Sequence, residues 1–294
     1  MTSKKIVTNN KTNILDAILT PQEYSQLKYK TPYILDFKKN NQEMLYIGVK
    51  HSRNPKSKQY LKIESLFEKF LKQYPSDTII IAIENFIPPA QKSKNDSIVS
   101  YGESGLLLYL AKKYKLNYFC PEPTQDNIIQ YILDKNLFKK EDIALWIFLN
   151  TLFNVLKKTP IIGEKELLFL DSIISSIVQR FESKKTDKYY WPLFIKRLRE
   201  ITGSDVLPNS ANDLRFKQIN IKLIEQLQNP FIKETILNDI GSMINYARDR
   251  FIADSIIKTI AHGKNIFAVF GVNHVVAQEP ALRLIFSKKK SVLF

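Results

Sequence analysis

The chain has 294 residues, of which 44% are hydrophobic, so it can bury a sizeable core as one large domain or two moderate ones. No apolar run reaches the roughly 18 residues of a membrane span, and we expect no transmembrane helix. The polar segment 1–11 lacks the apolar core of a secretory signal. The single cysteine, Cys120, is consistent with a reducing compartment. We expect a cytoplasmic bacterial protein, with signal-independent export left open.

The formal net charge of +15 raises the hypothesis of nucleic-acid binding. Most of the excess is lysine, spread along a chain rich in Asn, Ile and Tyr, a mixture that AT-rich codons produce. Arginine, the better residue for bidentate phosphate and base contacts, is sparse. Runs such as Lys288–Lys290 are typical of a solvated surface. We therefore expect no nucleic-acid partner, and a small molecule or peptide of unknown identity as the substrate.

The first structured stretch, from about residue 31 to 123, alternates strands with helices. The β-branched run Thr78–Ile83 is typical of a strand buried on both faces. The predicted elements are, in order, strands over 33–37 and 44–47, a helix over 61–74, a strand over 78–83, a helix over 105–114 and a strand over 117–120. This order predicts a parallel sheet with crossover helices, entered through a hairpin.

Strand patterns then disappear for more than a hundred residues. Helical periodicity takes their place over 143–156, 167–181, 191–201 and 214–227, with prolines such as Pro160 and Pro208 between the helices and Pro192 at the start of one. From residue 242 the first pattern returns, with a helix through 260, a strand over 266–270, a helix from 277 and a last strand over 291–294.

These patterns predict an α/β fold whose mainly parallel sheet is flanked by helices. Residues 31–123 and 242–294 form a discontinuous core domain, and residues 124–241 form a large all-helical insertion. Residues 1–30 form an N-terminal extension. We expect the insertion to act as a cap over the edge of the sheet where the strands end.

A Gly-x-x-His motif occurs twice, at Gly48–His51 and at Gly271–His274. Each copy follows an apolar run that predicts a buried strand. A glycine at a strand end allows a sharp turn, and ligands bind at the carboxyl ends of strands in open parallel sheets. Chance repetition of a short motif is the alternative, but the shared context favours one site built from both histidines.

Three glutamates are further candidates. Glu84 ends an apolar strand, where a carboxylate is either paired or functional, although an ordinary surface glutamate is the alternative. Glu103 precedes a predicted helix, where an acid is also favoured by the helix dipole. Glu122 lies between two prolines and is interpreted as a residue that supports the site or simply as a turn residue.

Arg248 and Arg250 could place a cation at the same site. The alternative is a surface ion pair of little energetic weight. The third histidine, His262, lies beside Gly263 at a predicted helix end, where a capping role is favoured over catalysis.

In this order, the two Gly-x-x-His motifs, the glutamates and the Arg-Asp-Arg segment resemble the TraB/Tiki superfamily. That group also includes ChaN-type haem-binding lipoproteins and erythromycin-esterase-like hydrolases. The resemblance covers the two α/β segments, roughly half the chain. It implies an α/β core with both histidines, a glutamate and an arginine at one site and, in the Tiki members, metal-dependent peptide cleavage.

Carried over, the resemblance implies a hydrolase of peptide or ester bonds that uses a divalent ion such as Mn, Co, Zn or Fe. The implied catalytic residues are His51, His274, Glu84, Glu103 and Arg250, with Arg248 as the second choice, and the implied metal ligands are His51, His274 and Glu84. A metal-free esterase-like reaction stays open. So do a protein that binds haem, iron or another ligand without turnover and a regulatory protein with a vestigial site.

Overall fold

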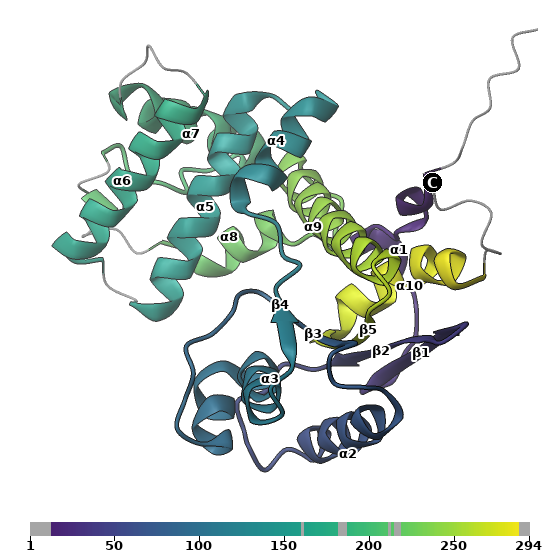
Figure 1. The fold of residues 1–294 in the computed structure, drawn as a ribbon. Coiled ribbons are helices and arrows are strands. Elements are labelled where there is room, and N and C mark those ends of the chain that lie inside the picture. The colour runs from purple at the N-terminus through teal and green to yellow at the C-terminus, as the bar shows by residue number, and fades with distance from the viewer. Residues whose placement is uncertain (1–12, 160–161, 182–186, 211–212, 215–218, 288–294) are drawn as a thin grey trace, which may run out of the picture. The chain divides into compact units, whose positions relative to one another are not determined.

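The structure, a computed structural model, describes residues 13–159, 162–181, 187–210, 213–214 and 219–287 (Figure 1). The chain divides into two compact units, one made of residues 1–124 and 248–294 and the other of residues 125–247. Helix α9 (Ile236–Ala261) runs from the second unit into the first. No helix in the described ranges has the length and hydropathy needed to span a membrane.

The first unit contains a five-stranded sheet with the strand order β1-β2-β5-β3-β4. The strands are β1 (Tyr33–Lys39), β2 (Gln42–Val49), β3 (Ile79–Ile83), β4 (Asn117–Phe119) and β5 (Asn265–Gly271). The hairpin strands β1 and β2 are antiparallel, and all other neighbours are parallel. The predicted α/β fold with a mainly parallel sheet is therefore confirmed.

The late strand β5 lies at the centre of the sheet, between β2 and β3. All seven of its residues are buried, as expected for an apolar run covered on both faces. Phe267 and Val269 pack with α2 (Lys58–Gln73) and α3 (Lys94–Lys113) on one face. Ile266, Ala268 and Phe270 pack with α9 and α10 (Val272–Ser287) on the other face. Figure 1 shows α2 and α3 on one side of the sheet and α9 and α10 on the opposite side. Sequence-distant segments thus share one core.

The N-terminal segment is part of the first unit. It contains a short 3-10 helix (Ile14–Ala17) and α1 (Pro21–Ser25), which begins at a capping box formed by Thr20 and Glu23. The Leu19 amide donates a hydrogen bond to the Ala277 carbonyl (3.0 Å), and Tyr24 packs on α10. These contacts fix the segment against the helix that follows the second Gly-x-x-His motif.

The second unit is helical throughout its described residues. Its helices are α4 (Gln125–Lys135), α5 (Lys140–Lys158), α6 (Glu164–Phe181), α7 (Asp187–Thr202), α8 (Ile221–Gln228) and the start of α9. One continuous apolar cluster forms its core, with α5 contributing Phe148, Leu149 and Leu152. The predicted all-helical insertion is confirmed for the residues that the structure describes.

Several predicted boundaries were wrong. Helix α7 begins at Asp187 instead of residue 191, so Pro192 lies in its interior and not at its start, and the helix predicted over 214–227 covers only Ile221–Gln228 of the described residues. Helix α9 begins at Ile236 and not near residue 242, and the Asn238 side chain in its first turn accepts a hydrogen bond from the Thr235 amide at 3.0 Å. Helix α10 begins directly after β5, at Val272. The strand predicted over 291–294 lies outside the described residues.

Candidate metal centre at the ends of three strands

The two Gly-x-x-His motifs meet because β2 and β5 are parallel neighbours, with Val49 paired to Gly271. A Cβ atom on Gly271 would lie 2.7 Å from Nε2 of His51, and a Cβ atom on Gly48 would lie 3.0 Å from the Cα of Val272. Each glycine therefore leaves room for the other motif. This reciprocal packing explains the residue type at both positions.

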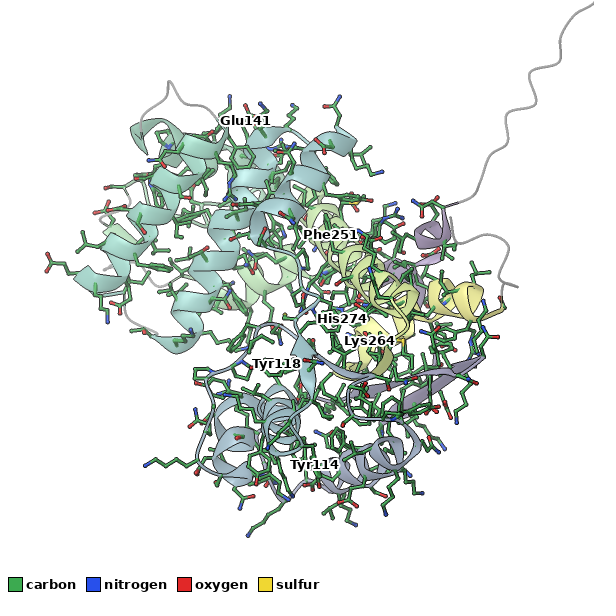
Figure 2. All side chains as sticks on the ribbon, in the orientation of Figure 1. Tyr114, Tyr118, Glu141, Phe251, Lys264 and His274 are labelled. Atoms are coloured by element: carbon green, nitrogen blue, oxygen red, sulfur yellow. The ribbon has the colours of Figure 1, made fainter. Side chains whose placement is uncertain are left out.

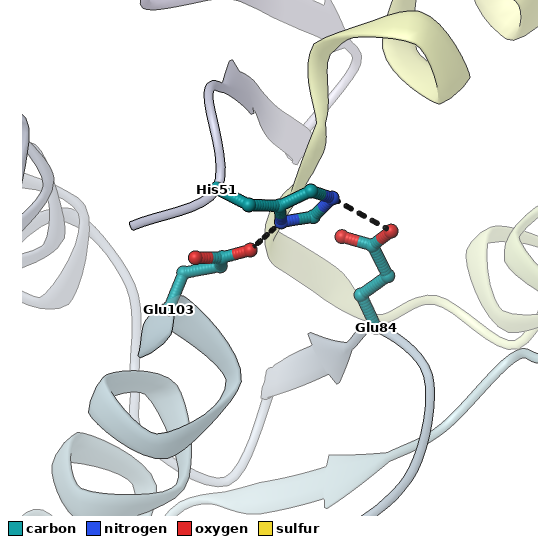
Figure 3. A group of neighbouring side chains, drawn as sticks. All are labelled: His51, Glu84 and Glu103. Carbon is teal, nitrogen blue, oxygen red and sulfur yellow. Dashed lines mark hydrogen bonds and ion pairs between the residues drawn. The ribbon is translucent and has the colours of Figure 1, made fainter. Parts of the chain in front are cut away.

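Glu84 lies between the two histidines. It follows β3, the other neighbour of β5, and is 1% exposed. Its Oε1 atom lies 3.8 Å from Nε2 of His51 (Figure 3). The same atom lies 3.6 Å from Nε2 of His274, and both distances are too long for a hydrogen bond. Its other oxygen, Oε2, accepts a hydrogen bond from the Gly271 amide at 2.6 Å. The fold thus brings His51, His274 and Glu84 together.

A carboxylate holds each histidine through Nδ1. Glu103 accepts from His51, and Asp249 accepts from His274 at 2.7 Å and from the Gln278 amide group at 2.7 Å. A carboxylate is acceptor-only when ionised, so Nδ1 carries a proton in both rings, and Nε2 of a ring that is neutral offers a lone pair towards Glu84. His274, labelled in Figure 2, lies in the first turn of α10.

Glu103 reaches His51 because α3 is interrupted at Gly102, whose φ is 59°. The helix is broken there, so Glu103 opens its second segment, in agreement with the prediction that it precedes a helix. A Cβ atom on Gly102 would lie 2.9 Å from the Ser52 carbonyl oxygen. Glycine at this position therefore provides both the left-handed backbone and the space for the loop that follows His51.

The arginine beside Glu84 is Arg248. Its guanidinium makes two hydrogen bonds of 2.7 Å to Glu122 and one of 2.9 Å to Asn85, and Nη2 lies 3.8 Å from Oε1 of Glu84. Glu122 thus supports the site. Arg248 therefore lies at the position beside Glu84 that was predicted from the sequence for Arg250.

The preference for Arg250 was wrong. Its Nη1 donates to the Leu15 carbonyl at 2.9 Å and to Asp16 at 2.8 Å, which ties the N-terminal segment to α9. Residues two apart on a helix point in different directions, so Arg248 and Arg250 cannot serve the same site.

The site shifts the acid–base properties of its members. Burial raises the pKa of Glu84, and the hydrogen bond to Glu103 raises the pKa of His51. Burial alone would lower the pKa of His274, but Asp249 outweighs it and the pKa of His274 is raised. For Glu122, burial is opposed by Arg248, which prevails and lowers the pKa. Glu84, His51 and His274 therefore retain their protons more readily than the free side chains do, and Glu122 releases its proton more readily.

Ligand atoms of His51, Glu84 and Glu103 all lie within 4.8 Å of one another, so this group could hold a metal ion. His274 is outside that group but faces the same Glu84 oxygen. His262 lies elsewhere: its Nδ1 donates to the Lys258 carbonyl at 2.7 Å in the last turn of α9, as its capping interpretation requires.

Sequence reasoning missed Asp249, which is 1% exposed and holds His274. A signal was present: Asp249 lies at helical spacing from Ile252 and Ile256, both fully buried. A carboxylate on the buried stripe of a helix requires a partner. In that segment, only the flanking Arg248 and Arg250 were named from the sequence as candidate site residues.

A cleft of about 210 Å³ opens beside His51. The loop after β2, the loop after β3 and the break in α3 form its walls. Its lining includes Arg53, Phe86, Tyr101 and Glu103. A substrate bound there would contact His51 and Glu103 directly.

No family model, no curated protein and no solved structure matches this chain. The resemblance to the TraB/Tiki superfamily therefore stays a prediction from the sequence motifs.

Proposed function

We propose that the protein is a metal-dependent hydrolase of the TraB/Tiki type that cleaves a peptide or ester bond. One observation carries the proposal. Nε2 of His51 and Nε2 of His274 each lie near Oε1 of Glu84, at distances that are too long for hydrogen bonds. The second polar atom of each side chain is already held, by Glu103, by Asp249 and by the Gly271 amide.

The residues fit a divalent ion. Two neutral imidazoles and one carboxylate are a common ligand set for Zn, Fe, Mn or Co. Nitrogen and oxygen ligands lie about 2.1 Å from zinc, so two ligands of one tetrahedral ion are about 3.4 Å apart. The separations of 3.8 and 3.6 Å from Glu84 are close to this value. The group whose ligand atoms all lie within 4.8 Å of one another contains His51 and Glu84 but not His274, so the two imidazoles would have to move closer together to share one ion. Glu103 is bonded directly to Nδ1 of His51, so we assign it outside the ligand set.

When bound, a divalent ion lowers the pKa of a coordinated water and polarises a carbonyl group. Glu103 and Asp249 orient the imidazole rings and increase the basicity of Nε2. Glu103 also lines the cleft, and we assign it to take the proton of the attacking water. Arg248 supplies the positive charge nearest Glu84 and is assigned to stabilise the negative charge that develops on the substrate.

The test is an assay of the purified protein on p-nitrophenyl esters of short acids and on peptide aminomethylcoumarins. We expect turnover of at least one substrate, loss after chelation, and recovery with Mn, Co, Zn or Fe. His51→Ala should abolish that turnover, and His262→Ala, which removes a histidine outside the site, should not change it.

Two results would contradict the proposal. If His51→Ala keeps the full wild-type rate, the histidine is not catalytic. If the protein instead carries haem absorbance and hydrolyses nothing, a binding protein without turnover is the better description.

A further inference from the structure

The cleft beside His51 carries two groups that the proposed chemistry does not use. Arg53 comes from the loop after β2, and Phe86 comes from the loop after β3. Phe86 is 51% exposed, and its ring meets Tyr101 edge to face with centroids 6.0 Å apart. Together Phe86 and Tyr101 offer an aromatic surface to a molecule in the cleft.

The position of Phe86 is fixed by the site itself. The preceding residue, Asn85, has a left-handed backbone with a φ of 68°, and the Phe86 amide donates to the Glu84 carbonyl at 2.9 Å. The Asn85 side chain accepts a hydrogen bond from Arg248 at 2.9 Å. Asparagine is among the residues that adopt this conformation most readily, and the contacts of Asn85 and Phe86 with Arg248 and Glu84 hold the exposed ring of Phe86 at the cleft.

Arg53 is held at the rim of the same cleft. The Tyr60 hydroxyl donates to the Ser52 carbonyl, and the Asn54 amide donates to the Ser52 hydroxyl at 3.2 Å, which orders the loop on both sides of Arg53. Within the described ranges, the exposed Arg53 guanidinium has neither an ion pair nor a hydrogen bond. It therefore presents an unused planar donor for a carboxylate.

We infer that the substrate carries a carboxylate close to an apolar or aromatic group. This inference rests on the proposed function and names the substrate class of the same site. Glu84 and Glu103 make the inner part of the site unfavourable for a free anion, so the carboxylate binds at the rim with Arg53. Phe86 and Tyr101 pack against the apolar group, and the bond to be cleaved points towards His51.

The test measures binding instead of turnover. Phenylacetate, which has no hydrolysable bond, is titrated into the as-purified protein and followed by NMR, beside the neutral analogue 2-phenylethanol and the ring-free acid acetate. We expect phenylacetate to bind more tightly than either. Arg53→Gln should weaken phenylacetate binding about tenfold and leave 2-phenylethanol unchanged. Phe86→Ala should weaken the binding of both phenylacetate and 2-phenylethanol.

Matched controls are Lys56→Gln, which removes an exposed cation from the same loop, and Leu61→Ala, which removes an exposed apolar side chain that is 68% exposed. Neither should change binding. The inference is overturned if 2-phenylethanol binds as tightly as phenylacetate, or if Arg53→Gln binds phenylacetate like the wild type. It is also overturned if chelation, but not Arg53→Gln, removes binding, because the carboxylate then binds a metal ion. None of these results depends on hydrolysis, so the proposed function is judged separately.

Discussion

Buried acidic residues are used differently in the two units. In the helical unit, Asp142 is buried and accepts from Arg197 at 2.6 and 3.2 Å. In the α/β unit, Glu84, Glu103 and Asp249 are all buried and gather around two histidines. The acid of the helical unit has a full counter-charge. Glu84, Glu103 and Asp249 instead share imidazoles whose charge depends on protonation, and Arg248 lies 3.8 Å from Glu84. Buried Glu43 of the same unit resembles Asp142, because it pairs with Lys38.

The difference distinguishes structural burial from functional burial. A buried carboxylate with a guanidinium partner is compensated, and removal of either partner leaves an uncompensated charge. Three carboxylates around two imidazoles are better balanced by an additional cation. Because this imbalance occurs at the ends of three strands, where open parallel sheets bind ligands, we expect a ligand site here and not a structural ion pair.

The largest expected effect is the loss of turnover when either histidine of the site is removed. The two variants should differ in stability. Removal of a ligand should lower turnover by about 1,000-fold or more for both His51→Ala and His274→Ala. The His51 side chain is 58% exposed, so its loss should leave the unfolding free energy almost unchanged. The His274 side chain is 12% exposed and pairs with Asp249, so its loss should also reduce that free energy by about 1–3 kcal/mol.

Steady-state kinetics and urea denaturation of the two variants check this prediction. The sequence alone had suggested that both variants would keep their stability, because residues at a sheet edge contribute little to the core. The burial of His274 changes that expectation for one of them. Equal stability losses for the two variants would show that His51 is more deeply integrated into the fold than its exposure indicates.

The second prediction concerns the helical unit. Asp142→Ala should lower the unfolding free energy by about 1–3 kcal/mol, because Arg197 loses its buried partner and keeps only the exposed Glu200. The number of metal ions per folded chain should stay at the wild-type value. Denaturation and elemental analysis test both statements, with Glu225→Gln, an exposed acid on α8, as the control. Loss of metal in folded Asp142→Ala would remove the distinction between the two units.

A smaller effect is expected when the residue that orients a metal ligand is changed and the ligand itself, His274, is kept. Asp249→Asn removes the negative charge behind His274 and keeps the size of the side chain. Metal affinity should fall about 10–100-fold, the usual effect of changing a group that orients a metal-bound histidine. Asp254→Asn, which alters a helical pair with Lys258 outside the site, is the control. Competition with a fluorescent chelator measures the affinity, and an unchanged value would assign Asp249 to folding alone.

The smallest effect is the pH dependence of the Arg248–Glu122 pair. The pKa of Glu122 is lowered in the folded protein, so the pair stabilises the fold above the ordinary carboxyl pKa of 4.5. This contribution is lost as the pH falls through the lowered value. The Tm of the wild type should therefore fall more between pH 6 and pH 3 than the Tm of Glu122→Gln. Parallel curves for the two proteins would show that the pair does not stabilise the fold.

The sequence predicts the fold class well because its strands are short apolar runs and its helices are periodic. It also predicts that His51, Glu84 and His274 end parallel strands, and such strand ends lie at one edge of a sheet. Side-chain direction along a helix is harder to predict, and Arg250 was preferred to Arg248 because a short motif does not reveal which helix face meets the sheet. Asp249 was missed for the same reason.

The reciprocal packing of the two glycines could not be predicted either. It depends on the pairing of Val49 with Gly271, and the β2–β5 register is set by contacts between segments more than two hundred residues apart. Each Gly-x-x-His motif is a local sequence pattern, but its glycine is required by a tertiary contact with the other motif.

The most direct test of the central claim is the metal content of the purified wild type and of Glu84→Gln, measured by inductively coupled plasma mass spectrometry. Gln keeps the shape of Glu84 but cannot supply a carboxylate to the two histidines. The account predicts about one divalent ion per wild-type chain and little or none in folded Glu84→Gln, with the ion retained in the Glu225→Gln control. A wild type that binds no divalent ion, or a Glu84→Gln variant that binds it as tightly as the wild type, would contradict it.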